Sequence, residues 1–309
     1  MRFFDLHCDT LYRLEEEKGN IYTNNFDVSI EKSEKYNPYI GCFAVWVPEK
    51  LEKEHAFNFF NRCKDTLELQ YKMYGNKFRL CKSKEDLEDI LVSKKPGVIL
   101  TIENSSALDG NLDNVKYINE CGVKIVTLTW NGKNDTGDGS GIKDAKGITN
   151  FGKKLVRELE KYNIIVDISH ASDKLFDDVC SIAHKPFIAT HSNSRSVCNH
   201  RRNLTDEQFN CIKIKGGIVG ITFCSEFLND SRLATFDDIL RHVDYFLAMS
   251  GEDVLSIGSD FDGATLGKNM HGLGFVEDLY EYFLIKNYKE SLLDKIFFSN
   301  AFNFIKGFY

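Results

Sequence analysis

Histidine and carboxylate side chains follow five short apolar runs of this chain, always at the end of the run. The runs and the residues that follow them are FFDL with His7 and Asp9, VILTI with Glu103, IIVDIS with His170, FIAT with His191 and LSIGS with Asp260. Continuous apolar runs are typical of buried parallel strands, whose carboxyl ends meet at one edge of a sheet. Parallel α/β enzymes keep their reactive groups at that edge, so we expect these side chains to converge.

The types and spacing of five of these residues suit two divalent metal ions. His7 and Asp9 are two residues apart on a predicted strand, so both side chains lie on one face and can bind a single ion. The carboxylate of Glu103 can bridge two cations, while His170 and His191 can supply neutral nitrogen to the second ion. Two such ions, about 3.5–4 Å apart, share a water molecule, lower its pKa towards neutrality and polarise the carbonyl that it attacks. The pattern therefore predicts a hydrolase with two divalent ions, and zinc is the metal we expect.

Asp260 has a different expected role, that of the proton carrier. It lies in the segment GSDFDG at the end of the last predicted strand, where it can accept a proton from the attacking water and pass it to the leaving nitrogen. The alternatives are a further metal ligand or a carboxylate that orders the loop. Asp262 is a weaker candidate because its side chain points away in an extended chain. Each of these positions taken alone can also cap a helix or bind loop backbone, and only their common place on the strands favours the catalytic interpretation.

Strand-like and helix-like segments alternate along the chain. The predicted strands cover residues 3–8, 41–47, 97–102, 124–130, 164–169, 186–191, 217–223 and 254–260. The predicted helices cover residues 51–76, 84–93, 111–121, 148–162, 172–183, 205–215, 235–250, 277–286 and 289–306, with Ser172, Thr205 and Thr235 as N-caps. This alternation is typical of α/β proteins and predicts a closed (β/α)8 TIM barrel, which the expected metal ligands make one of the metal-dependent hydrolase type. No Pro-rich or low-complexity linker divides residues 1–309, so we expect a single domain.

Composition and charge limit the possible partners. The 309 residues are 42% hydrophobic and 28% charged, which is enough apolar material for a full core, and the net charge is −7. An acidic protein suits neither phosphate neutralisation nor an anionic membrane, so we expect no nucleic-acid or membrane partner. No segment has the length of a membrane span, and because an expected strand begins within the first few residues, we expect no signal peptide. We expect a cytoplasmic protein, and a homodimer is an assembly that the sequence leaves open.

Nine cysteines, an odd number, lie mostly inside apolar runs and form no CxxC pair. This usage is typical of reduced, buried cysteines in a cytosolic protein. Cys8 lies between His7 and Asp9, but strand alternation turns it to the opposite face, where we expect it to pack.

Five sequence segments resemble the membrane dipeptidase (renal dipeptidase-like) family of metallopeptidases. They are DLHCDTL, the glutamate after the third strand, DISHAS, THSNSRSVCNHRRNLTD and GSDFDG, and they extend from the first strand to the last. The resemblance implies an amidohydrolase-type barrel with two zinc ions that hydrolyses dipeptides, often with tolerance for a D-residue at the C-terminal position. It places His7, Asp9, bridging Glu103, His170 and His191 on the family's metal positions and Asp260 on its acid/base aspartate. Arg202 falls on the arginine that holds the substrate carboxylate, a task suited to a bidentate guanidinium.

The chain departs from the family pattern at two places. Where well-known members read TLTH, with a histidine near the scissile carbonyl, this chain reads TLTW, which places Trp130 there. Asn131 or Asn134 is then the nearest polar candidate for binding the developing oxyanion. The family's EGG is here ENS, residues 103–105, so the backbone near the bridging carboxylate can differ. We therefore expect an intact metal site with an altered substrate preference.

Three functions are compatible with these residues. A dipeptidase is favoured because the resemblance covers the whole series of expected ligands. A related amidohydrolase that acts on an N-acyl amino acid or a cyclic amide is the second, with Trp130 as an apolar wall. A metal-binding module without turnover is the third, and the presence of every expected ligand and of Asp260 argues against it.

Overall fold

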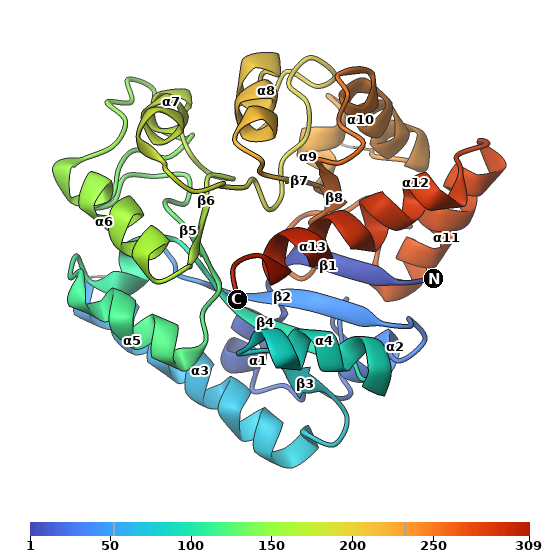
Figure 1. The fold of residues 1–309 in the computed structure, drawn as a ribbon, viewed down its shortest axis with the longest axis horizontal. Helices are drawn as coiled ribbons and strands as arrows, with labels where there is room; N and C mark the ends of the chain where they lie inside the picture. Colours follow the sequence, from blue (N-terminus) through green and yellow to red (C-terminus); the bar gives the residue numbers. More distant parts are fainter. Residues whose placement is uncertain (52, 232) are drawn as a thin grey trace.

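A parallel β-sheet surrounded by helices forms the centre of the computed structural model, which describes residues 1–51, 53–231 and 233–309 (Figure 1). Its strands are β1 (Phe3–Cys8), β2 (Tyr39–Trp46), β3 (Arg79–Leu80), β4 (Gly97–Glu103), β5 (Ile125–Thr127), β6 (Ile165–Asp167), β7 (Val219–Ile221) and β8 (Leu255–Ile257). The order along the sheet is β6-β5-β4-β2-β1-β8-β7, with the short β3 beside β4, and the paired strands are parallel. Because the strands are parallel, their carboxyl ends lie on the same side of the sheet.

Helices occupy most of the connections between the strands. The helical segments are α1 (Thr10–Glu17), α2 (Ile30–Ser33), α3 (Lys53–Tyr74), α4 (Lys84–Ser93), the 3-10 turn η1 (Ser105–Leu108), α5 (Asp113–Cys121), α6 (Asn150–Lys161), α7 (Asp173–Ile182), α8 (Asp206–Ile214), α9 (Ser225–Leu228), α10 (Phe236–Ala248), α11 (Gly272–Ile285), α12 (Glu290–Asp294), the π turn η2 (Lys295–Ser299) and α13 (Asn300–Lys306). The last of these cross the middle of the view in Figure 1, beside β1 and β2. The alternation of strand and helix that the sequence predicts is therefore present.

Seven of the eight predicted strands have a counterpart, although several are shorter than predicted. The exception is the segment 186–191, which contains no named strand in the described chain. Instead, Ile188 and Ala189 pair through isolated parallel bridges with Asp167 of β6 and Val219 of β7. The structure adds β3, which has only two residues and is too short to be recognised as an apolar run. Residues 188–189 therefore lie between β6 and β7, the two strands at the ends of the sheet order.

Most helix boundaries agree with the prediction to within a few residues. The hydroxyls of Ser172 and Thr205 cap α7 and α8, and Thr205 forms a capping box with Gln208. Thr235 precedes α10 as predicted. The predicted helix 289–306 is divided by η2, and the one predicted from 277 already begins at Gly272. Glu52, which falls inside the predicted helix 51–76, lies outside the described residues.

An apolar layer packs between the strands and the C-terminal helices. It is formed by Phe4, Leu6, Ile40, Cys42, Ile99, Ile125, Ile165, Ile188 and Ile218 together with Phe298, Phe302 and Ile305. Burial of side chains from several strands in one layer is the packing expected inside a parallel α/β sheet that curves. This layer supports the strands whose far ends carry the candidate site.

Lys124 is a buried cation at the start of β5. Its Nζ donates to the carbonyl of Phe308 at 3.2 Å and lies 4.0 Å from the centre of the Tyr309 ring. Burial lowers the pKa of Lys124 to about 8. The contacts of Lys124 with a backbone carbonyl and an aromatic ring link β5 to the last residues of the chain, although burial disfavours the charged form.

The prediction that all cysteines are reduced is wrong for two of them. Cys180 of α7 and Cys211 of α8 form a disulfide, because the two helices pack side by side and bring residues 31 positions apart together. The remaining seven are free within the described chain, and Cys121 is the one among them that is not buried. Cys8 is fully buried in the hydrophobic core, as predicted. The cytoplasmic location stays a prediction.

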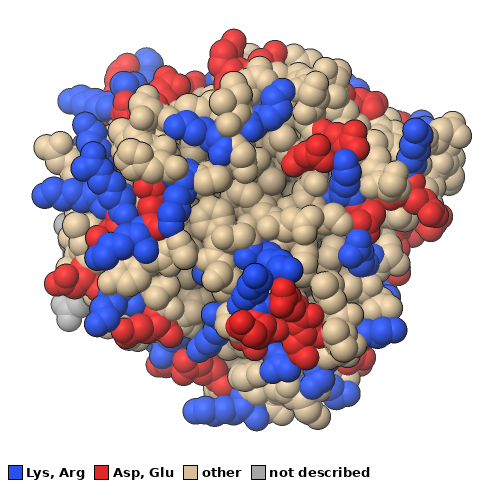
Figure 2. Space-filling view, viewed as in Figure 1, with Lys and Arg blue, Asp and Glu red and all other residues tan. Residues whose placement is uncertain are grey.

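The surface carries both signs of charge. On the face drawn in Figure 2, Lys and Arg side chains are interspersed with Asp and Glu around the rim, and no continuous basic stripe is visible there. Within the described residues, none of the helices combines the length and the apolar character needed to cross a membrane. The absence of a nucleic-acid partner stays a prediction.

Candidate metal centre and substrate pocket

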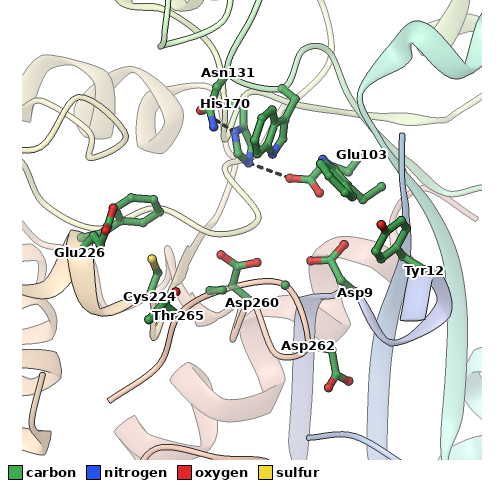
Figure 3. A pocket seen from close by; sticks show the side chains of 15 residues that line it. Asp9, Tyr12, Glu103, Asn131, His170, Cys224, Glu226, Asp260, Asp262 and Thr265 are labelled. Atoms are coloured by element: carbon green, nitrogen blue, oxygen red, sulfur yellow. Dashed lines mark hydrogen bonds and ion pairs between the residues drawn. The ribbon is translucent and has the colours of Figure 1, made fainter. Parts of the chain in front are cut away.

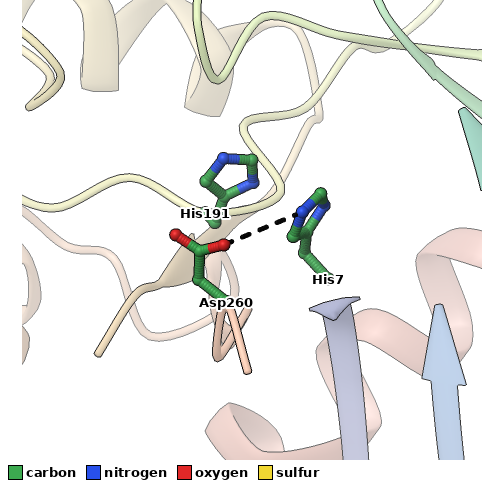
Figure 4. A group of neighbouring side chains, drawn as sticks. All are labelled: His7, His191 and Asp260. Carbon is green, nitrogen blue, oxygen red and sulfur yellow. Dashed lines mark ion pairs between the residues drawn. The ribbon is translucent and has the colours of Figure 1, made fainter. Parts of the chain in front are cut away.

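Six side chains meet where the strands end, as the sequence predicts. β1 contains His7 and is followed by Asp9, β4 ends at Glu103, and the segments after β6, residues 188–189 and β8 carry His170, His191 and Asp260. Asp260 is the most exposed of the six, with 14% of its side chain accessible. Figure 4 shows His7, His191 and Asp260 facing one another from different parts of the chain. The fold therefore brings together residues that are up to 253 positions apart in the sequence, from His7 to Asp260 (260 − 7 = 253).

His170 and His191 present free nitrogen atoms to Glu103. Their Nε2 atoms lie 3.0 Å apart, and Glu103 Oε1 lies 2.7 Å from that of His170 and 3.6 Å from that of His191. On the far side of the His170 ring, Nδ1 lies 3.1 Å from Asn131 Oδ1, which can only accept, so the ring proton is at Nδ1 (Figure 3). Burial lowers the pKa of both imidazoles well below the ordinary value. A neutral imidazole with a free Nε2 is the form that binds zinc and similar ions.

A buried carboxylate, Asp167, fixes the ring of His191 through a hydroxyl group. Nδ1 of His191 lies 2.9 Å from Thr190 Oγ1, and the Thr190 hydroxyl donates to Asp167 Oδ2 at 2.7 Å. Thr190 has one hydroxyl proton, so its oxygen accepts from Nδ1 of His191 and leaves Nε2 free. Asp167 also accepts from Thr127 and from Ser169, and Ser169 Oγ in turn accepts from the backbone N–H of His191. Hydrogen bonds of this kind orient a metal ligand and set its tautomer.

His7 and three carboxylates form the other half of the cluster. His7 Nε2 lies 3.4 Å from Asp9 Oδ2, 3.7 Å from Glu103 Oε2 and 3.9 Å from Asp260 Oδ1. His7 Nε2 and Asp9 Oδ1 are buried, and neither has a hydrogen-bond partner among the described residues. Burial alone would lower the pKa of His7, but Glu103, Asp9 and Asp260 together raise it to about 10. The surplus of negative charge around this nitrogen favours a cation at the centre of the cluster.

The donor atoms form three overlapping groups that could hold metal ions. The groups are His7 with Asp9 and Glu103, Glu103 with His170 and His191, and His7 with His191 and Asp260, and the donor atoms of each group lie within 4.8 Å of one another. Glu103 belongs to two groups, and its two oxygens face different histidines, Oε2 towards His7 and Oε1 towards His170. Buried atoms without hydrogen-bond partners and neutral imidazoles fit a divalent ion with nitrogen and oxygen ligands, such as Zn²⁺.

The backbone turns Asp260 towards this cluster. Its φ is 63°, which is uncommon for a residue other than glycine, and its N–H donates to the carbonyl of His7 at 3.0 Å. Burial raises the pKa of Asp260 to about 6. A carboxyl group with a pKa near neutrality can both accept and return a proton. Asp262 is engaged elsewhere, because it accepts from Thr10 and from the backbone of Asp27, as expected of a side chain that points away.

Arg202 is the buried cation of the site. Only 4% of the residue is exposed, and none of its three guanidinium nitrogens has a hydrogen-bond partner in the described parts of the chain. The guanidinium carbon lies 5.3 Å from the centre of the Phe227 ring, and Asp260 and Glu103 act electrostatically on the group. A buried guanidinium with unused donors is costly unless an anion pairs with it. This arrangement fits the predicted binding of a substrate carboxylate.

A cavity of about 330 Å³ opens beside the cluster, near the lower end of the volumes typical of small-ligand sites. Its polar part includes Asp9, Glu103, His170 and Asp260, and Asn131, Glu226, Asp262 and Thr265 also line the cavity (Figure 3). Its aromatic part is formed by Tyr12, Trp46, Trp130 and Phe227. The cavity is therefore bounded by the candidate metal ligands on one part of its surface and by aromatic rings on another.

The polar residues near Trp130 have separate tasks. Trp130 lines the cavity and stacks on His170, with ring centres 5.8 Å apart and an interplanar angle of 29°. Asn131 also lines the cavity, but its carbonyl oxygen is bound to His170, so only its amide nitrogen is available for a substrate. Asn134 uses its amide nitrogen to donate to the carbonyl of Leu128, and its oxygen accepts from loop backbone. Asn134 therefore orders the loop, whereas Asn131 can contribute to the pocket.

The sequence analysis did not identify several residues that support the site. Asp5, fully buried in β1, accepts from the backbone and hydroxyl of Ser259 and from the backbone of His7, and burial raises its pKa to about 7. Asp5 precedes His7 by two residues, and Asp167 precedes His170 by three. A carboxylate inside an apolar run, shortly before a candidate ligand, is therefore the sequence pattern that could have indicated these supporting residues. At residue 104, where the family has glycine, the backbone keeps a conformation that favours glycine, because Asn104 has a φ of 80°. The replacement therefore changes the backbone beside Glu103 little.

The fold and the site together define a parallel α/β hydrolase of the metal-dependent type. The sequence model of the membrane dipeptidase family, peptidase family M19, matches residues 1–307, and the chain belongs to this family. An uncharacterized protein in the pqqA 5' region of Klebsiella pneumoniae is 32% identical over 246 residues, which are 75% of this chain and 90% of that protein. Dipeptidase 3 of Homo sapiens is 29% identical over 237 residues, which are 72% of this chain and 48% of that protein.

Solved structures share the fold along the whole chain. The dipeptidase AC, a metallo peptidase of family M19, has a TM-score of 0.92 at 25% identity and is covered to 98%, with 99% of this chain aligned. A metallo peptidase from Rhodobacter sphaeroides, solved with a phosphinate mimic of the dipeptide L-Ala-D-Ala, has a TM-score of 0.93 at 24% identity over 100% of this chain and 99% of that one. Both structures are similar to this chain in the arrangement of the complete sheet and its helices.

Proposed function

We propose that this chain is a dipeptidase that uses two divalent metal ions, with zinc as the expected metal, to hydrolyse free dipeptides. The proposed ligands are His7, Asp9, Glu103, His170 and His191. The observation that supports the proposal most is the combination of this donor cluster with Arg202, a buried guanidinium with no hydrogen-bond partner in the described chain. Such a group needs an anion, and the C-terminal carboxylate of a dipeptide supplies one. A cavity of about 330 Å³ suits a small peptide better than a long one.

Asp260, Arg202 and Asn131 each have one proposed task in the reaction. When bound, the metal ions supply an activated water and polarise the scissile carbonyl. Asp260 takes a proton from the water as its oxygen bonds to the carbonyl carbon, and returns it to the leaving nitrogen as the C–N bond breaks, which yields two amino acids. Arg202 holds the terminal carboxylate and so positions the peptide bond beside Asp260. The amide nitrogen of Asn131 is the proposed donor to the developing oxyanion.

The proposal includes three finer features. The sheet is proposed to be a closed (β/α)8 barrel in a single domain, and the bridges of Ile188 and Ala189 to β6 and β7 support closure. A D-residue is proposed to be accepted at the C-terminal position, in line with the L-Ala-D-Ala mimic bound by the Rhodobacter sphaeroides protein. The protein is proposed to act without a nucleic-acid or membrane partner.

Metal removal and reconstitution test the proposal. The purified protein should lose hydrolysis of dipeptides on chelation and regain it with Zn²⁺, Co²⁺ or Mn²⁺, because the His and carboxylate donors accept all three. The substrate panel should contain L,L- and L,D-dipeptides, N-acyl amino acids and cyclic amides, which separates a dipeptidase from a related amidohydrolase. Full activity of a verified metal-free preparation, or turnover of the acylated or cyclic compounds alone, would contradict the proposal.

A further inference from the structure

Three aromatic rings form a continuous wall on one side of the pocket. Tyr12 of α1 contacts Trp46 at the end of β2 edge to face, with ring centres 4.9 Å apart. Trp46 contacts Trp130 in the same manner at 5.3 Å, and all three residues line the cavity. The indole nitrogen of Trp46 is buried and has no hydrogen-bond partner among the described residues, so ring contacts rather than a hydrogen bond hold this side chain. The wall, defined by these three residues, therefore offers an apolar surface to a ligand.

The wall lies across the pocket from the carboxylate-binding side. Arg202 packs near Phe227, which lines the cavity together with Cys224. In Figure 3, Tyr12 and Cys224 lie on opposite sides of Asp9 and Asp260. A dipeptide whose C-terminal carboxylate pairs with Arg202 and whose scissile carbonyl lies at the metal cluster has only its N-terminal residue left for the far side. The order of these groups across the pocket thus fixes which side chain meets the wall.

We propose that Tyr12, Trp46 and Trp130 bind the side chain of the N-terminal residue and make this protein prefer dipeptides with a large apolar or aromatic residue at that position. This inference rests on the proposed dipeptidase function. Trp130 is also tied to the metal site, because its ring stacks on His170. Trp46 and Tyr12 have no ring contact with a candidate ligand among the contacts of the described chain, so they can be changed with less effect on metal binding.

Two substrate series test the preference. In the series Xaa-Ala, with Gly, Ala, Leu, Phe or Lys as Xaa, kcat/KM should be about 10- to 100-fold higher for Phe-Ala than for Gly-Ala, the usual range for a side chain in an apolar pocket. In the reversed series Ala-Xaa the dependence on size should be smaller. A higher value for Lys-Ala than for Phe-Ala, or a stronger dependence in the Ala-Xaa series, would overturn the inference.

Variants of the wall test its residues directly. Trp46→Leu should lower the ratio of Phe-Ala to Gly-Ala about tenfold, and Tyr12→Leu provides a second variant in case the first does not fold. Tyr71→Leu is the matched control, because it also removes one ring of an edge-to-face pair, with Phe78 at 5.3 Å, but outside the pocket. Metal content is measured in every variant.

The outcomes distinguish this inference from the proposed function. An unchanged ratio in both wall variants, or an equal loss for all substrates, would overturn the inference while dipeptide turnover remains. Turnover of dipeptides with no dependence on Xaa would also overturn the inference alone. Absence of turnover of every dipeptide by the metal-loaded protein would overturn the proposed function and, with it, the inference.

Discussion

Replacing Thr190 by valine should weaken metal binding without removing any ligand. The hydroxyl of Thr190 lies 2.9 Å from His191 Nδ1 and 2.7 Å from Asp167 Oδ2, and valine keeps the shape but cannot accept or donate. The variant leaves the Nδ1–H of His191 buried without a hydrogen-bond partner, which raises the free energy of this arrangement of the ring by about 1–3 kcal/mol. It also allows the ring to place its proton on Nε2, the atom that faces Glu103 and His170. We expect a loss of about 10- to 100-fold in metal affinity, the usual effect of removing such a supporting hydrogen bond.

Competition with a chelator of known affinity measures this change. Thr190→Ser keeps the hydroxyl and should retain most of the affinity. Thr101→Val is the matched control, because the Thr101 hydroxyl is also buried but has no hydrogen-bond partner among the described residues. The reasoning would be refuted by an unchanged affinity in Thr190→Val, or by an equal loss in Thr101→Val. At saturating metal, kcat of Thr190→Val should return close to that of the unchanged protein.

Three further predictions concern the proton carrier, the carboxylate partner and the buried lysine. Asp260→Asn should keep metal occupancy but lower kcat by about 10²- to 10⁴-fold, the usual contribution of a positioned proton carrier, and loss of metal in this variant would instead identify Asp260 as a ligand. Arg202→Ala should lower kcat/KM for free dipeptides by a factor that corresponds to about 2–4 kcal/mol of transition-state stabilisation, and it should affect their C-terminal amides much less. Equal losses for acid and amide would exclude carboxylate recognition. The pKa of Lys124 is lowered to about 8 from 10.5, so the folded state binds this proton more weakly than the unfolded state does. Stability is therefore lost as the pH falls from 10.5 towards 8, and little more is lost at lower pH. The free energy of unfolding should therefore rise by about 1.3 kcal/mol from pH 7 to pH 9, and Lys124→Met should remove this part of the pH dependence in denaturant titrations, which an identical slope in both proteins would contradict.

The candidate ligands could be predicted from the sequence because each lies at the same place of a repeated strand and helix unit. A strand that is buried on both faces is recognisable as an apolar run, so the residue that follows it is recognisable too. The supporting residues were harder to predict, since Asp167 and Thr190 act through contacts with residues from other strands. The hydrogen bond between Asn131 and His170 was likewise invisible, because it joins two loops 39 residues apart.

Short elements and cross-chain pairs account for most of the remaining differences. β3 has two residues, so its sequence cannot be distinguished from that of a loop. The segment 186–191 forms only bridges, but its sequence cannot be distinguished from that of a strand of ordinary length. The aromatic wall depends on the end of β2, on α1 and on the loop after β5, and only the fold brings these together. The disulfide could not be foreseen, because spacing alone does not show which cysteines face each other on neighbouring helices.

That disulfide has a topological consequence for the site. Cys180 and Cys211 are 31 residues apart, and the covalent ring that they close contains both His191 and Arg202. In the unfolded chain such a ring removes conformational freedom worth about 3–4 kcal/mol, so a metal ligand and the proposed carboxylate partner are carried by a segment that cannot fully extend. A thiol reductant would open the ring and would also compete for metal. Measurements of metal affinity and of unfolding therefore report on the same segment, and they are comparable only between samples in the same redox state.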